Sequence, residues 1–288
     1  MGGGRGTARQ YDLTPHLASG QFPHRFGCVF KKVDQRIVTH APTVLGQLHG
    51  LANPHRFMGF ASAATPWCMA LAGTLLIAGL YGALFAAPAD YQQGDSARIM
   101  YVHVPAAWLA MAGYSGIVIA SAIGLIFKHP LADTAAKSMA LPGAVFTALA
   151  LITGSLWGKP TWGTFWVWDA RLTSVLVLLF LYVGYMAIWE AIEEPTRAAR
   201  AAAILALVGA VNVPIIHYSV EWWSTLHQGT SVLRKDGPSM PWSMLWPLLS
   251  MAFAYQALFA GIVLVRMRSE ILERRLRTRR LSLGEEAP

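Results

Sequence analysis

Apolar positions along this chain gather in six uninterrupted runs, each with few charged residues inside it. A bilayer core about 30 Å thick requires roughly 20 helical residues to cross it, so each run predicts one transmembrane helix. The short alternating strands typical of a membrane β-barrel do not occur in the pattern. The six predicted spans are 66–86, 106–127, 137–157, 172–192, 199–216 and 242–265.

The composition points the same way. Of the 288 residues, 55% are hydrophobic and only 13% are charged, which is too little charge to cover the surface of a soluble domain. We therefore predict an all-α, polytopic membrane protein with six transmembrane helices.

Lys and Arg are distributed unevenly between the segments that flank these spans. Positive residues collect on the cytoplasmic side of membrane proteins, and here most of them lie in the N-terminal segment, the C-terminal tail and two short connections. We therefore predict that both the N- and the C-terminus are cytoplasmic. The net charge of +8 requires no nucleic acid, because a basic tail beside anionic lipid accounts for it. Only five of the 23 Lys and Arg residues fall in the outer connections: Arg98, Lys159, Arg171, Arg234 and Lys235.

The pattern divides the chain into three parts. Residues 1–60 are rich in Gly, His and Arg, and they predict a poorly ordered cytoplasmic extension. Residues 61–268 form the membrane domain, and residues 269–288 form a basic cytoplasmic tail. Three longer connections of the membrane domain are predicted to lie together on the outer side: 88–104, 158–171 and 217–241.

Residues 157–171, which include the second outer connection, are unusually rich in tryptophan. Trp162, Trp166 and Trp168 share this short segment with Asp169 and Arg171. Tryptophans also form aromatic belts at membrane interfaces without any ligand, but a belt rarely requires this density. The segment favours a flat, apolar surface for a large planar ligand such as haem. Asp169 is predicted either to pair with Arg171 or to start the following helix.

Two histidines are predicted to lie at the outer boundary of the membrane. His103 precedes the second span, and His217 lies at the outer end of the fifth. A single interfacial histidine is most simply explained by a hydrogen bond to backbone or water. Two at similar depth beside a tryptophan surface predict axial ligands of haem iron, because neutral imidazole is the usual ligand. His227 is predicted to lie on the surface of the third outer connection.

Two arginines are candidates for binding the propionates of such a ligand. Arg98 lies in the first outer connection and Arg171 in the second, and a guanidinium can pair with a carboxylate through charge-assisted hydrogen bonds.

The sequence lacks the residues that nucleotide binding or hydrolysis would require. The segment from Gly154 to Pro160 resembles a phosphate-binding loop, but its glycine spacing is one residue short and Pro160 replaces the Ser or Thr that would bind magnesium. The sequence shows neither a Ser-His-Asp nor a Cys-His arrangement for hydrolysis. We therefore predict that the protein is not an enzyme.

Four segments together resemble one known family. Residues 162–173 (WGTFWVWDARLT), with 89–94 (ADYQQG), 101–105 (YVHVP) and 216–223 (IHYSVEWW), resemble the CcmC family of haem-handling membrane proteins with a tryptophan-rich (WWD) domain. These proteins belong to the cytochrome c maturation system. The resemblance covers roughly residues 45–268, and residues before about 44 have no counterpart in it. They are expected to be either a real extension or the result of a misplaced start codon.

The resemblance implies a haem site on the periplasmic face of a bacterial inner-membrane protein. It implies that haem b is the bound cargo, that His103 and His217 are the axial ligands, and that Arg98 and Arg171 are propionate partners. It also implies that the protein presents haem to the periplasmic chaperone CcmE, beside the ABC-type subunits CcmA and CcmB and the small membrane subunit CcmD.

Two other functions remain open at this point. The protein could export haem across the bilayer through its own spans, or it could anchor the chaperone without binding haem. An exporter would require a polar route at mid-membrane depth, and the sequence offers little of one.

Overall fold

The computed structural model describes residues 2, 53–227, 229, 231, 232, 234 and 236–283. Most of the predicted N-terminal extension, residues 1–60, therefore lies outside the described residues. Its last part, 54–60, is helical and not poorly ordered, because α2 already begins at Pro54. The predicted basic tail is described as far as Leu283, and it continues the last helix as far as Ser282.

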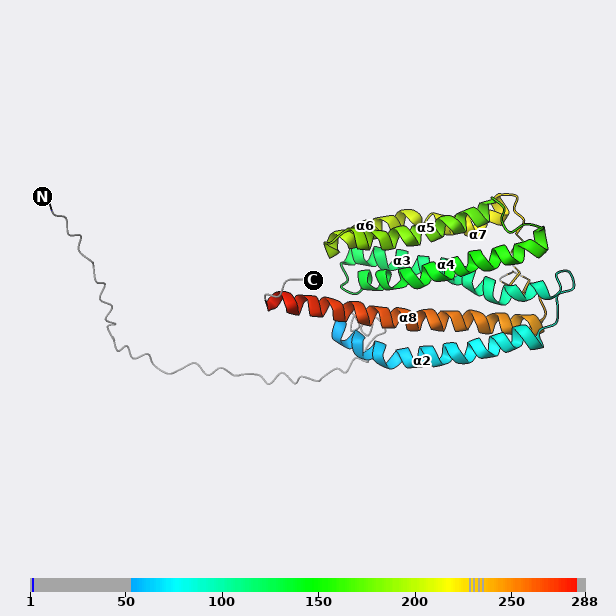
Figure 1. Ribbon diagram of the computed structural model, residues 1–288, viewed down its shortest axis with the longest axis horizontal. Coiled ribbons are helices and arrows are strands. Elements are labelled where there is room, and N and C mark those ends of the chain that lie inside the picture. Colours follow the sequence, from blue (N-terminus) through cyan, green and yellow to red (C-terminus); the bar gives the residue numbers. More distant parts are fainter. Residues whose placement is uncertain are drawn as a thin grey trace, which may run out of the picture. The chain divides into compact units, whose positions relative to one another are not determined.

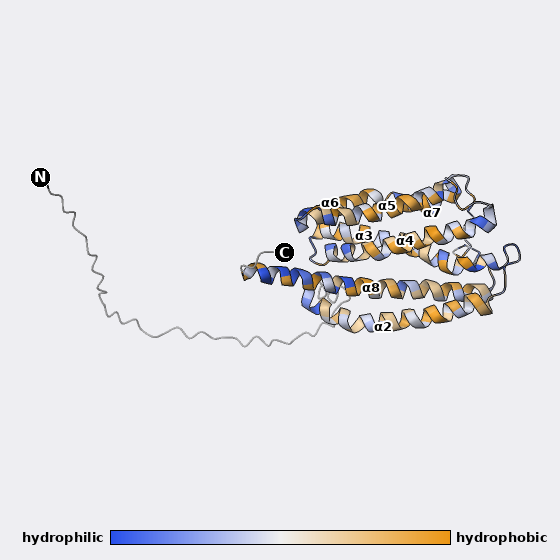
Figure 2. Ribbon diagram, in the orientation of Figure 1, coloured by the Kyte–Doolittle hydropathy of each residue, from blue (hydrophilic) through white to orange (hydrophobic). Residues whose placement is uncertain are grey.

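The described part of the chain consists of helices and contains no strand (Figure 1). Six helical segments are long and apolar enough to cross a membrane, which confirms the predicted all-α, six-span class. Figure 2 shows apolar residues along all of these helices, whereas the C-terminal part of α8 is hydrophilic. The elements are α2 (Pro54–Tyr81), η1 (Gly82–Ala86, a π-helix), η2 (Asp95–Ile99, a 3-10 helix), α3 (Met100–Phe127), α4 (Ala132–Trp162), α5 (Ala170–Ala191), α6 (Pro195–Gly209), α7 (Asn212–Trp222) and α8 (Trp242–Ser282).

The helices pack largely as neighbouring pairs. α2 packs along α8, α3 along α4, and α5 along α6, while α8 also contacts α3 and α4 (Figure 1). Tyr114 and Tyr182 fill the space between α3, α5 and α6, with their rings edge to face at 5.2 Å. Tyr182 donates a hydrogen bond to the carbonyl oxygen of Ala110 at 2.8 Å, which satisfies its buried hydroxyl group.

The fifth span is not one continuous helix, although its sequence predicts one. α6 ends at Gly209 and α7 begins at Asn212. Pro214 has no backbone N–H and cannot continue the helical hydrogen bonds. The turn between the two helices is tighter, because its N–H groups donate to the carbonyl oxygen three residues earlier. The Asn212 side chain donates to the carbonyl oxygen of Ser174 at 2.9 Å, which ties the break to α5.

Described residues of the three longer connections contact one another at one end of the helices. Trp157 near the end of α4 donates its Nε1–H to Gln93 Oε1 in the first connection at 2.8 Å. Asp169 in the second connection contacts His227 in the third. Among the described residues, the connections at the opposite end are the short segments 128–131 and 192–194.

Candidate functional site

The tryptophan-rich segment begins where α4 stops. Gly163 follows Trp162 in the left-handed conformation, with φ of 79°, which glycine adopts without strain and which ends the helix. The chain then runs in an irregular loop to Asp169, whose Oδ1 accepts a hydrogen bond from the backbone N–H of Leu172 at 2.7 Å. Of the two roles predicted for Asp169, the structure therefore shows the one at the helix start.

The second oxygen of Asp169 holds a histidine. Asp169 Oδ2 lies 3.3 Å from His227 Nδ1, and the two side chains are only 6% and 19% exposed. The His227 ring also packs edge to face on Trp162, with ring centroids 4.8 Å apart. The prediction that His227 lies on the loop surface is therefore wrong: its ring is enclosed by the tryptophan segment.

The surroundings of His227 favour its neutral form. Burial lowers the pKa of His227 below its ordinary value, and the charge of Arg171 lowers it further. The Asp169 carboxylate partly offsets this by raising the pKa. At neutral pH the ring is therefore a neutral imidazole with its Nδ1–H directed at a carboxylate.

His103 is fixed against α4 from the first turn of α3. Its Nδ1 lies 3.0 Å from the carbonyl oxygen of Ala150 and 3.2 Å from Thr153 Oγ1. Its ring meets Trp157 edge to face at 5.8 Å. A Cβ on Gly154 would lie 2.9 Å from His103 Cε1, so the ring occupies space that only glycine leaves open.

Both imidazoles are therefore held in the same way. A carbonyl or carboxylate oxygen can only accept a hydrogen bond, so Nδ1 carries the proton in His103 and in His227. In a neutral imidazole this leaves Nε2 with a free lone pair, the usual arrangement of an imidazole that ligates a metal. Arg171 and the ring of His227 also lie near enough to His103 to interact with it electrostatically.

His217 has different surroundings. It lies on an exposed face of α7, and its ring packs edge to face on Tyr218 at 4.7 Å. Tyr218 in turn stacks on Trp222 at 5.3 Å. The role of His217 as an iron ligand stays a prediction, because the contacts that enclose His103 and His227 do not include it.

The two arginines both bind backbone carbonyl groups. Arg98 donates from Nη1 to the carbonyl oxygens of Ala83 and Ala87 and from Nε to Asp95, at 2.9 Å for the latter, and so ties η2 to the end of η1. Arg171 Nη2 lies 3.5 Å from the carbonyl oxygen of Ile216 and links the start of α5 to α7. Their roles as propionate partners stay predictions.

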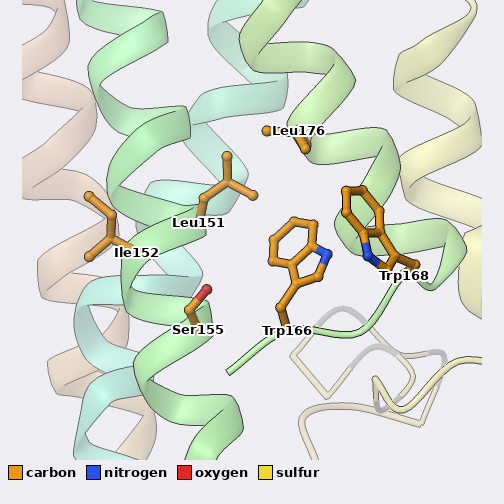
Figure 3. A pocket seen from close by; sticks show the side chains of 6 residues that line it. All are labelled: Leu151, Ile152, Ser155, Trp166, Trp168 and Leu176. Carbon is orange, nitrogen blue, oxygen red and sulfur yellow. The ribbon is translucent and has the colours of Figure 1, made fainter. Parts of the chain in front are cut away.

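The three tryptophans do not form a single flat surface. Trp162 lies against His227, whereas Trp166 and Trp168 pack edge to face on each other at 5.5 Å. Trp166 and Trp168 border an open groove of about 360 Å³ between α4 and α5 (Figure 3). Its other walls are nearly all apolar: Leu151, Ile152, Ser155 and Leu176.

Trp168 is 75% exposed, and the Nε1–H of Trp166 is buried without a hydrogen-bond partner among the described residues. The segment thus presents one aromatic wall to the histidines and another to the groove.

These side chains suit haem better than a bare metal ion. In the part of the chain that the structure describes, no three His, Cys, Asp or Glu side chains come together as a bare ion would require. Haem iron needs only one or two protein ligands, because the porphyrin supplies the other four. His103 beside Trp157 and His227 beside Trp162 are each oriented through Nδ1, so each could supply such a ligand through Nε2.

The fold and this site define a class: a six-helix, multi-pass membrane protein with two anchored imidazoles in a tryptophan-rich end. Residues 47–282 match the family model "CcmC: Heme exporter protein C". The chain belongs to this family, which confirms the resemblance inferred from its motifs.

The chain is similar to curated relatives along most of its length. It is 55% identical to "Heme exporter protein C" of Bradyrhizobium diazoefficiens over 79% of this chain and 86% of the relative. It is 50% identical to the Escherichia coli K12 protein of the same name, over 78% and 91%. It is also 45% identical to a "Putative cytochrome c biosynthesis ccmC-like mitochondrial protein" of Marchantia polymorpha, over 67% and 81%.

Proposed function

We propose that this protein binds haem b at its loop-bearing end and presents it to a partner protein during cytochrome c maturation. The single observation that carries the proposal is the shared anchoring of His103 and His227, each through Nδ1 with Nε2 left free. The names of the relatives, which refer to heme export and cytochrome c biosynthesis, support the choice of cargo.

The geometry favours His103 and His227 as the axial pair. Both rings are partly buried, both are oriented by an oxygen acceptor, and each packs on an indole, Trp157 or Trp162. The pair His103 and His217 predicted from the sequence is the alternative. His217 is exposed and held only by aromatic neighbours, so it would bind iron without the buttressing oxygen that usually orients a metal-bound imidazole.

Charge at the site suits a dianionic porphyrin. Arg171 is half-buried and interacts electrostatically with Asp169 and His227. A guanidinium in such a position interacts strongly with a carboxylate because little water screens it. We propose Arg171 as the main propionate partner. Arg98 would contribute through the N–H groups left over from its contacts with Ala83, Ala87 and Asp95.

Release of the cargo requires an accessible edge. Trp168 and Phe165 are both largely exposed next to the site, and exposed aromatic residues are typical of protein-binding surfaces. We propose that the periplasmic chaperone CcmE docks on this edge, and that exchange of one axial imidazole lets the haem pass to it. CcmA, CcmB and CcmD would be the remaining subunits of the assembly.

The distribution of charge supports a periplasmic position for the site in a bacterial inner membrane. The opposite end carries the arginine-rich continuation of α8, which the positive-inside rule assigns to the cytoplasm.

The two other functions have less support. An exporter that moves haem through its own helices would require a polar route, yet tyrosines and small residues fill the space between α3, α5 and α6 at mid-depth. A chaperone anchor that binds no haem would not need two oriented imidazoles. Catalysis is not part of the proposal.

The test is the absorption spectrum of the protein purified in nanodiscs, with matched His103→Ala, His227→Ala and His217→Ala variants. We expect the wild-type Soret band to shift or vanish in the first two variants and to survive in the third. Loss of the band in His103→Ala and His217→Ala, with survival in His227→Ala, would restore the sequence-predicted pair. If the wild-type protein is unpigmented and binds no added haem, the function that remains is a chaperone anchor without haem.

A further inference from the structure

The last helix continues well beyond the membrane domain. α8 has 41 residues, which at 1.5 Å per residue is about 61 Å, roughly twice the thickness of a bilayer core. Figure 1 shows its C-terminal part running past the start of α2. Its last buried residue is Ile271, which packs with Met267 against Phe57 and Leu131. Residues 272–283 therefore form an extension outside the bundle, which is helical as far as Ser282.

Salt bridges fix the base of this extension. Glu270 Oε2 lies 2.8 Å from Lys137 Nζ on α4, and Glu270 Oε1 lies 2.9 Å from Arg274 Nε. One carboxylate thus joins the first turn of the extension to the neighbouring helix. The extension leaves the bundle from a fixed base.

One face of the extension is an apolar stripe. Leu272 and Leu276 are spaced by four residues, which places them on the same side of the helix, and Leu283 follows at its C-terminal cap. They are 45%, 55% and 65% exposed. Exposed leucines in register on a charged helix are typical of a surface that another helix covers.

Positive charge surrounds the stripe. The extension holds five arginines and one glutamate. Beside the leucines, Arg275 and Arg279 help to line an open hollow of about 410 Å³. Figure 2 shows this end of α8 as hydrophilic, in contrast to the rest of the helix.

We propose that residues 272–283 dock an acidic protein helix, whose apolar side covers the leucines and whose Asp or Glu side chains meet the arginines. Charge complementarity identifies the occupant. A second copy of the extension would bring like charges together, and so would residues 1–52 of the chain, which contain six Lys and Arg but only two acidic residues.

Anionic lipid, the partner suggested by composition alone, fits the geometry less well. Residues 262–283 contain neither Gly nor Pro, and sharp helix bends arise at such residues. Leu276 lies eleven residues beyond Val265, where the apolar run ends, which is about 16 Å along the helix. An unbent continuation of a transmembrane helix therefore carries the leucines away from the headgroups instead of laying them on the bilayer.

The test uses the full chain in nanodiscs of neutral lipid and, as the probe, a synthetic helical peptide with a leucine stripe flanked by glutamates. We expect Leu272→Ser with Leu276→Ser, and separately Arg275→Glu with Arg279→Glu and Arg280→Glu, to weaken peptide binding about tenfold or more. Arg200→Glu, an exposed charge reversal on α6 at the same end, serves as the control and should bind like wild type.

Equal affinity of all variants would overturn the proposal. So would tighter binding of the full chain to anionic vesicles than to the peptide, or peptide binding that begins only after residues 1–52 are deleted, since that segment would then be the occupant. The Soret band of both variants should match wild type, which separates this surface from the haem site. In cells, a photo-crosslinker at position 276 should react with an acidic helix of a partner protein, and this product should disappear in the arginine variant.

Discussion

Asp169 and His227 contact each other across 58 positions of the sequence, with Oδ2 3.3 Å from Nδ1. The same carboxylate caps α5 through its other oxygen. One side chain therefore both starts a helix and orients an imidazole from a separate connection. This contact joins the second and third outer connections into one site.

Asp169→Asn separates these two tasks. Asparagine still caps a helix, so we expect near wild-type thermal stability, but the neutral amide no longer stabilises the His227 Nδ1–H. Loss of such a supporting group typically weakens metal binding about 10–100-fold, and we expect a similar loss in a haem titration. Asp169→Ala removes the cap as well and should cost about 1 kcal/mol more in unfolding free energy. Equal haem affinity in all three proteins would contradict this role of Asp169.

Haem binding should depend on pH through His227. Only neutral imidazole binds iron, and burial lowers the pKa of His227 below its ordinary value of 6.5. We therefore expect affinity to be constant at alkaline pH and to fall only below about 6.5, once the ring takes up a proton. The stability that the neutral buried ring contributes should be lost in the same window, because the unfolded state binds the proton first.

The control for this pH dependence is Asp169→Asn. The carboxylate raises the pKa of His227, so its removal should move the fall in affinity to lower pH. A shift to higher pH would contradict the assignment.

Gly154→Ala should displace His103 without unfolding α4. The new Cβ would lie 2.9 Å from His103 Cε1, closer than such contacts allow, so the ring has to move. Alanine is the better helix former by about 1 kcal/mol, and circular dichroism should show a helix at least as stable. We expect the Soret band to change as in His103→Ala. Gly184→Ala, whose Cβ would meet Leu205 at an ordinary 3.4 Å, is the matched control and should retain the spectrum.

Trp157→Phe tests how the first outer connection is held. Phenylalanine keeps an aromatic ring beside His103 but loses the 2.8 Å hydrogen bond to Gln93. We expect a loss of about 1 kcal/mol in unfolding free energy. In a double-mutant cycle with Gln93→Ala, the two losses should be less than additive, and strict additivity would show that the hydrogen bond contributes nothing.

Hydropathy alone determined the six spans, because a residue that faces lipid must be apolar whatever its neighbours in the fold are. The same local information indicated His103 and the helix-start role of Asp169, since both lie at helix ends whose position the pattern shows. The break between α6 and α7 could also have been expected from Pro214. These features depend on neighbours a few residues away.

Only the tertiary structure brought His227 into the site. It lies in an irregular connection with no periodic pattern, so its depth and direction depend on how the ends of α4 and α5 meet the third connection. The sole signal in the sequence was that it is one of three histidines in the outer segments. The division of the tryptophans between His227 and the groove has the same cause, because a loop's side chains are oriented by the helices against which they pack.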